Sequence, residues 1–271
     1  MGFFEKFVLL SDLIGFFLVT RYPYFDLFCM LMKLGRSTDK YVGTNKAYTP
    51  STSIFSMEML RENFDVYLHG SIYFVCATGM TLDIGRRNCG LVSAFHIVYL
   101  AISTCFENKQ YWSEFMMVKV VARAVAVVAC YLFIAGGLTD SRRGLAKVSN
   151  FLQIGRQLLA LYLFYLAYML WINREDRIAL VKHIPGGIIM LIVVVVIYVG
   201  CGLCIYGGYE AGYFGKLATW QLLIITLLSD LDTKFWYKAN DRIDHWTQIQ
   251  LASRHFAVMG GLILLGRKRH W

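Results

Sequence analysis

Residues Gly186–Tyr206 read GGIIMLIVVVVIYVGCGLCIY and carry no formal charge. An α-helix of this length rises about 30 Å, which is the thickness of the hydrocarbon core of a bilayer. The stretch therefore predicts a transmembrane helix. Further apolar segments of similar length occur along the chain, so we expect the bilayer to be the solvent that decides the fold.

The composition agrees with that interpretation. Hydrophobic residues make up 57% of the chain and charged residues 17%, with a mean hydropathy of +0.50. Soluble domains carry about 25% charged residues. We predict an all-α, polytopic membrane bundle of about seven or eight transmembrane helices, with an N-terminal amphipathic segment.

The chain divides into three parts by pattern. Residues 1–23 predict an interfacial amphipathic segment that ends where Pro23 breaks or kinks the helix. Residues 24–265 predict the multi-pass bundle, and 266–271 a short basic tail. Within the bundle, 35–63 predicts an exposed loop. The clearest apolar segments are 64–84, 89–106, 115–138, 151–172, 186–206, 214–229 and 249–265.

Basic residues gather in short groups at the ends of predicted helices. These groups are Arg86-Arg87, Arg142-Arg143 and Arg267-Lys268-Arg269. The positive-inside rule favours the side that places all three in the cytosol, together with the C-terminus. The net charge of +9 thus suits contact with membrane lipids. No basic stripe interleaved with aromatic residues indicates nucleic-acid binding.

Three basic residues fall inside or near predicted spans. Lys119 and Arg123 are four residues apart and share one helix face. Arg123 is deep enough in its span that a free charge would be costly, so we expect it to face the bundle interior or water. Arg156 follows Gly155 near the start of the next span and is typical of an interfacial arginine. These three residues are the candidates for intramembrane polar chemistry.

Cysteines and acids give little sign of catalysis. The seven cysteines lie in or beside apolar runs, which is typical of buried thiols. Cys201 and Cys204 form a C-x-x-C pair within an apolar helix, for which packing is favoured over redox chemistry. Asp65 and His69 share a helix face, but two ligands do not define a metal site. We predict no metal, no cofactor and no enzymatic activity.

The last polar loop, predicted from Asp230 to Gln248, combines acids with aromatic residues. Asp230 and Asp232 could accept hydrogen bonds from a cationic amine, and Trp236 could contact an apolar side chain. These three residues are the candidates for binding a peptide end.

Several short motifs resemble the Surfeit locus protein 4 family. They occur in that family's order: Trp112, Gly155-Arg156 in LQIGRQLL, Phe235-Trp236, Gly260-Gly261 in FAVMGGLILL, and a basic tail ending in Trp271. The resemblance extends from about Tyr24 to the C-terminus.

The resemblance implies a multi-pass cargo receptor of the endoplasmic reticulum membrane and the ER–Golgi intermediate compartment. Such a receptor binds soluble secretory proteins in the lumen, supports their export in COPII vesicles and returns with the COPI coat. It would bind cargo through Asp230, Asp232 and Trp236. Its retrieval signal would include Lys268 and Arg269, although Arg269 stands where the family has lysine.

Two other functions compete with this hypothesis. A small-molecule or ion transporter would use Arg123, Arg156 and an intramembrane acid along its path. A membrane thiol redox protein would use Cys201 and Cys204.

Overall fold

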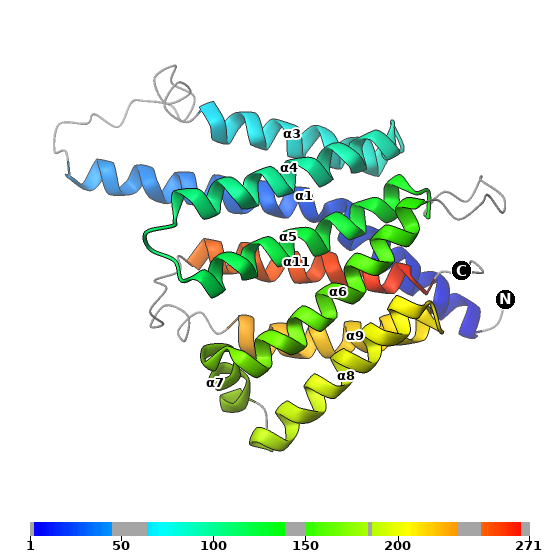
Figure 1. Cartoon of the computed structure of the whole chain (residues 1–271). Coiled ribbons are helices and arrows are strands. Elements are labelled where there is room, and N and C mark those ends of the chain that lie inside the picture. The colour runs from blue at the N-terminus through cyan, green and yellow to red at the C-terminus, as the bar shows by residue number, and fades with distance from the viewer. Residues whose placement is uncertain (1–2, 45–63, 139–149, 184–185, 232–244, 267–271) are drawn as a thin grey trace.

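The computed structural model describes residues 3–44, 64–138, 150–183, 186–231 and 245–266, and every regular element among them is a helix. Eight helices of 15 residues or more lie side by side (Figure 1). They are α1 (Phe3–Thr44), α3 (Phe64–Leu82), α4 (Arg86–Glu107), α5 (Glu114–Ala135), α6 (Asn150–Ile172), α8 (Gly187–Gly207), α9 (Ala211–Ile225) and α11 (His245–Leu264). The short helices α7 (Arg174–His183) and η1 (Thr226–Asp230) lie at one end of the bundle.

The protein is a polytopic helical membrane protein, as predicted. Six described helices are long and apolar enough to cross a bilayer: Leu10–Leu34, Arg86–Glu107, Glu114–Ala135, Asn150–Ile172, Gly187–Gly207 and Ala211–Asp230. This is fewer than the seven or eight expected. The long helices α3 and α11 run beside these six but are not among the candidate spans.

Helix α1 differs from the prediction of a break at Pro23. It continues from Phe3 to Thr44 with Pro23 inside it, and its apolar part, Leu10–Leu34, qualifies as one span. The helix therefore does not break at Pro23, and it extends past Gly35, where we expected the exposed loop to begin. The interfacial position expected for residues 1–23 stays a prediction. Membrane helices tolerate an internal proline because neighbouring helices and local adjustments satisfy the freed backbone groups.

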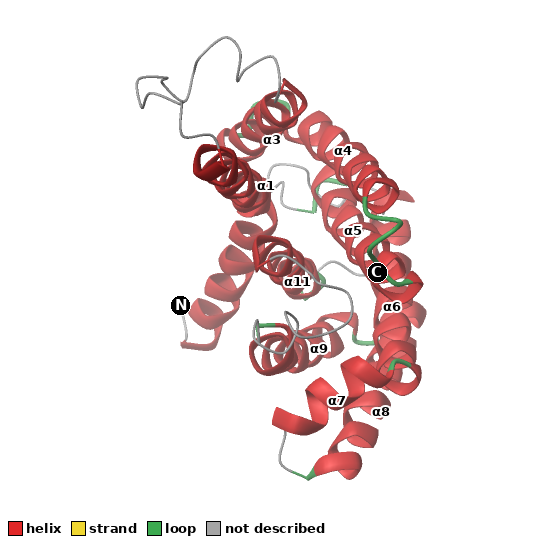
Figure 2. Cartoon of the chain, turned by 90° about the vertical axis from the view of Figure 1, so that its left-hand side faces the viewer, coloured by secondary structure: helices red, strands yellow, loops and turns green. Residues whose placement is uncertain are grey.

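The helices form two adjoining rings that share α5 and α11. The first ring contains α1, α3, α4, α5 and α11, and the second contains α5, α6, α8, α9 and α11. Seen along the helices, α11 lies between α1, α5 and α9 (Figure 2). Helix α7 contacts α6, α8 and η1, so it covers one end of the second ring.

Small residues bring α11 close to its neighbours. A Cβ atom added to Gly260 would lie 2.7 Å from the carbonyl oxygen of Gly15 in α1. One added to Gly261 would lie 2.3 Å from Sγ of Cys130 in α5. Small residues at such contacts allow membrane helices to pack backbone against backbone. The Gly260-Gly261 pair thus fixes α11 against both α1 and α5.

The basic turn between α3 and α4 lies at one end of the bundle. The α3–α4 turn with Arg86 and Arg87 lies at the same end as the close of α5 and the close of α11 (Figure 1). Those two ends lead into the basic groups at 142–143 and 267–269, which lie outside the described residues. By the positive-inside rule, Arg86 and Arg87 favour a cytosolic position for that end.

Candidate functional site

Helix α5 carries Arg123 into the bundle. The helix begins at Glu114, where Ser113 caps it by accepting a hydrogen bond from Met116 N at 3.3 Å. Arg123 follows nine residues later, about 13 Å along the helix axis. Its side chain is 2% exposed. A charge at that depth is costly unless an opposite charge and hydrogen bonds compensate it.

Asp230 supplies that opposite charge. Arg123 Nη2 donates to both carboxylate oxygens, at 3.0 Å to Oδ1 and 2.9 Å to Oδ2. Asp230 is itself only 4% exposed. The pair joins α5 to the end of η1 across the second ring, so it links helices separated by more than a hundred residues.

A π-helical turn positions Asp230. Five residues, Thr226–Asp230, continue α9 in π geometry, and Leu231 N donates to Thr226 O at 3.1 Å. Gln248 of α11 donates to the Asp230 carbonyl at 2.6 Å and holds the turn in place. Single π-helical turns are rare and occur frequently at functional sites. Asp230 is thus presented to the interior by an unusual local backbone.

His255 of α11 completes a buried cluster with the ion pair. Its Nδ1 lies 2.8 Å from Asp230 Oδ2 and 2.9 Å from Thr226 Oγ1. Its Nε2 lies 2.7 Å from the hydroxyl of Tyr162 in α6. The ring is 2% exposed. Because imidazole exchanges protons readily, this cluster combines two fixed charges with a proton acceptor.

A small cavity adjoins this cluster. Its volume is about 40 Å³, and Arg123, Tyr165, Tyr198, Asp230 and His255 are among its lining residues. A water molecule needs about 10–15 Å³ by this measure, so the cavity has room for about three waters or for one small ion.

A second ion pair lies on the side of the cavity nearest α7. Lys119 Nζ is 2.6 Å from Asp176 Oδ1, and Asn173 Nδ2 donates to Asp176 Oδ2 at 3.2 Å. Both charged side chains are about one-tenth exposed. They tie α7 to α5 and line the cavity on that side.

The first ring contains a different polar cluster. Arg254 of α11 donates to Tyr22 Oη at 3.3 Å and to Val120 O at 3.1 Å. Gln250 Nε2 donates to Asp26 Oδ1 at 2.6 Å, and Lys33 Nζ donates to Gln250 Oε1 at 2.6 Å. Arg254 and His255 are neighbours in sequence, so α11 supplies one basic side chain to each ring.

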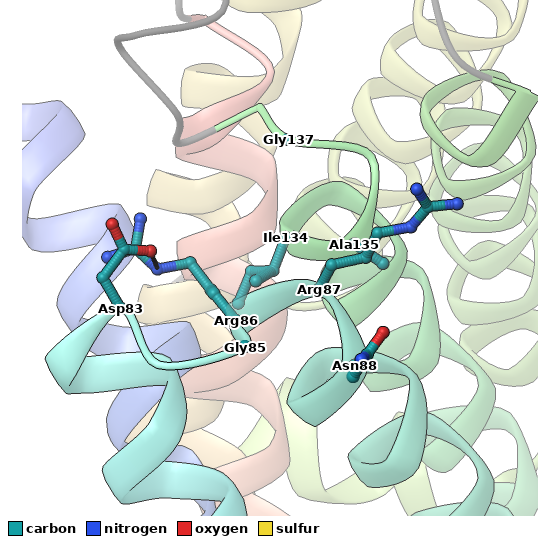
Figure 3. A pocket seen from close by; sticks show the side chains of 8 residues that line it. All are labelled: Asp83, Gly85, Arg86, Arg87, Asn88, Ile134, Ala135 and Gly137. Carbon is teal, nitrogen blue, oxygen red and sulfur yellow. Dashed lines mark ion pairs between the residues drawn. The ribbon is translucent and has the colours of Figure 1, made fainter.

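The α3–α4 turn forms a larger pocket of about 260 Å³ (Figure 3). Arg86 turns toward Asp83, with Nε 3.2 Å from Oδ1, and its guanidinium lies 5.1 Å from the ring centroid of Phe16. Arg87 points the opposite way and lies 5.7 Å from the ring centroid of Phe151. Since the two guanidinium groups diverge, the second-ring cavity is the better candidate site.

The structure brings together only part of the predicted polar set. Lys119, Arg123 and Asp230 lie around one cavity. We expected Asp230 in an exposed loop, and that prediction was wrong. The π-helical turn η1 continues through Asp230, so the residue is buried. Arg156 lies elsewhere, near the α8–α9 turn, where a Cβ atom on Gly208 would approach its Nη1 to 2.5 Å.

The other predicted residues either lie outside the described residues or are found elsewhere in the bundle. Asp232, Trp236, Lys268 and Arg269 lie outside the described residues. The seven cysteines are all free thiols. His69 Nδ1 lies 2.9 Å from His96 Nε2. Among the described residues, no group of three metal-binding side chains occurs.

Sequence reasoning missed His255, Tyr162 and Asp176. The first had a usable signal, since Arg254 and His255 interrupt the last apolar segment at its middle. Asp176 lies in a short polar stretch that looked like a loop but forms α7. Tyr162 is one of many tyrosines, and no local pattern distinguishes it.

The fold and this cluster define a class: a multi-pass helical membrane protein with a buried, charged centre between its helices. The chain matches the family model described as the TMEM101 protein family over residues 4–268, and it belongs to that family. No solved structure matches it.

This match overturns the resemblance to the Surfeit locus protein 4 family. The motifs that carried it, such as Gly155-Arg156 and Gly260-Gly261, are short combinations of small and basic residues. Gly260 and Gly261 serve close helix packing here, a role that many unrelated membrane bundles require. Their order along the chain was therefore not specific evidence of that family.

Proposed function

We propose that this protein transports a small polar solute across its membrane and binds it beside Arg123, Asp230 and His255. The observation that carries the proposal is a buried ion pair and a histidine around a water-sized cavity within a membrane bundle. Ionisable groups inside membranes are costly, and they mark solute, ion or proton paths more often than they serve packing.

The surroundings of the cavity suit alternating access. On one side stand α7 and the Lys119–Asp176 ion pair. On the other side, farther along α6, Leu159 and Leu163 are fully buried. The cavity thus has polar contacts at one end and apolar packing beyond it along α6, the two sides between which a transporter alternates access. The π-helical turn supplies backbone that can rearrange locally.

Accessibility from the two membrane faces tests this function without knowledge of the solute. Ser229 lines the cavity and is 5% exposed, and cysteine is close to it in size. In a background without native cysteines, Ser229→Cys would be treated with a membrane-impermeant maleimide in right-side-out and inside-out vesicles. Ala160→Cys provides the control, since Ala160 is fully buried and does not line the cavity.

A transporter exposes its site to each face in turn, so the Ser229→Cys protein should be labelled in both kinds of vesicle. The Ala160→Cys protein should remain unlabelled in both. Labelling of the Ser229→Cys protein from one face alone, or from neither, would refute transport through this cavity. Elution of both variants as single species in detergent establishes that the proteins are folded.

The cargo-receptor hypothesis has lost its support. Its assignment to the endoplasmic reticulum and to COPII and COPI transport came from the family resemblance. Asp230, its candidate for binding a cargo amine, has both carboxylate oxygens bonded to Arg123 or His255. We therefore favour transport, the alternative that the sequence had already raised.

A further inference from the structure

The cavity in the second ring is lined by unused hydrogen-bond donors. Arg123 Nη1 and the hydroxyls of Tyr165 and Tyr198 are buried and have no hydrogen-bond partner among the described residues. All three residues line the cavity. A guanidinium can only donate, and each hydroxyl has a proton to donate. Buried donors without partners are uncommon, so their convergence indicates a ligand that accepts hydrogen bonds.

The charges around the cavity indicate what such a ligand would carry. Lys119 and Arg123 pair with Asp176 and Asp230, so these four residues sum to zero while His255 is neutral. An acceptor with one negative charge would leave the site at −1. Protonation of His255 would return the sum to zero. In a desolvated site, the anion and the proton should therefore favour each other's binding.

The hydrogen bonds of His255 identify the nitrogen that would take the proton. Its Nδ1 faces Asp230 and Thr226 and serves as the donor to the carboxylate. Its Nε2 then accepts from Tyr162. A proton from water would form an N–H bond at Nε2, and the Tyr162 hydroxyl would turn to accept it. The other titratable groups around the cavity are Arg123 and Lys119 of α5, Tyr165 of α6, Asp176 of α7 and Tyr198 of α8.

We propose that this cavity binds one small monovalent anion, a halide or a carboxylate of about formate size, together with one proton on His255. Arg123, Tyr165 and Tyr198 donate to the anion. The volume of about 40 Å³ suits an occupant of this size. The inference rests on the proposed function, because it identifies the transported solute with the occupant of this cavity.

Isothermal titration of the full-length protein in detergent tests the site. Chloride and formate would be titrated separately, in gluconate buffer, since gluconate is too large for the cavity. Each titration would be repeated in two buffers of different ionisation enthalpy, which reports the protons taken up per anion. We expect about one proton, and a dissociation constant that rises up to ~10-fold per pH unit as the pH increases.

Two variants remove donors without removing charge. Tyr198→Phe and Tyr165→Phe should each raise the anion's dissociation constant by roughly 10–100-fold, since a hydrogen bond to a charged group is lost. Tyr131→Phe is the matched control, because its hydroxyl is also buried and unpartnered among the described residues but lies in the first ring. His255→Gln should abolish the proton uptake, whereas His96→Gln should preserve it.

The results distinguish a halide site from a carboxylate site, and they test the anion inference separately from the transport proposal. Tighter binding of chloride assigns a halide site, and tighter binding of formate assigns a carboxylate site. Binding of neither anion would overturn the inference, as would affinity unchanged by both tyrosine variants or binding without proton uptake. Two-sided labelling of the Ser229→Cys protein with no anion binding would leave transport standing and reject only the anion.

Discussion

Removal of one member of the Arg123–Asp230 pair should destabilise the protein far more than removal of both. Breaking a buried ion pair costs about 3–5 kcal/mol, because the remaining charge is uncompensated. At roughly 2–4 °C per kcal/mol for a chain of this size, either single variant should lower Tm by about 6–20 °C. A well-packed apolar replacement of both residues is often neutral.

The contacts predict an order between the two single variants. After Arg123→Met, Asp230 keeps its contact with His255 and can also take up a proton. After Asp230→Leu, Arg123 loses the carboxylate that accepts its hydrogen bonds, and a guanidinium cannot lose its proton. Asp230→Leu should therefore be the more damaging change. The double variant should be more stable than either single variant.

Thermal unfolding in detergent, followed by tryptophan fluorescence, measures all three proteins. Asp83→Asn is the control, since the Asp83 side chain is 67% exposed in its pair with Arg86 and surface pairs contribute about 0–1 kcal/mol. A double variant less stable than both single variants would refute mutual compensation. Equal stability of all variants would show that the pair is not desolvated.

Three further predictions concern packing, thiols and orientation. Gly260→Ala should lower Tm, because the new Cβ atom would lie 2.7 Å from Gly15 O. Gly200→Ala is the control: nothing lies within 4 Å of its Cβ position, so this variant should raise stability by about 0.5–1 kcal/mol. A Gly260→Ala protein as stable as the wild type would contradict the close contact. Replacing Cys201 and Cys204 with Ala in the otherwise native protein should leave anion binding and its proton uptake intact, and loss of that binding would revive the redox alternative. A glycosylation acceptor inserted after Tyr111, in the α4–α5 turn, should be modified in microsomes, whereas one inserted after Gly208, in the α8–α9 turn, should not. The reason is that the two turns lie at opposite ends of the bundle, and the proposed orientation places the first in the lumen. The reverse pattern would show that the orientation is inverted.

The sequence was sufficient for the helices because hydrocarbon imposes their length. Gly186–Tyr206 anticipates α8, Gly187–Gly207, within one residue at each end. The prediction failed at Pro23, where a rule for isolated helices was applied to a helix packed inside a bundle. Pro23 stops helices in water, but inside a membrane bundle its freed carbonyl can be satisfied by neighbours, and α1 continues past it.

The sequence predicted the burial of Arg123 in the candidate site but not the residues that surround it. The depth of Arg123 required a partner inside the bundle, and that reasoning was sound. The partner could not be identified, because Asp230 lies more than a hundred residues away and its helix ends with a π turn that has no simple sequence signal. The donors Tyr165 and Tyr198 converge only through the packing of α6 against α8.

The order of synthesis gives the central position of α11 a further meaning. Helix α11 touches α1, α5 and α9 and belongs to both rings, yet it is the last helix that the ribosome delivers among those described. Until it arrives, Asp230 lacks His255, and α1 lacks the glycine contact at Gly260. The earlier helices therefore cannot complete their packing until α11 has been synthesised. A premature stop codon late in the gene would leave both rings without the helix that they share.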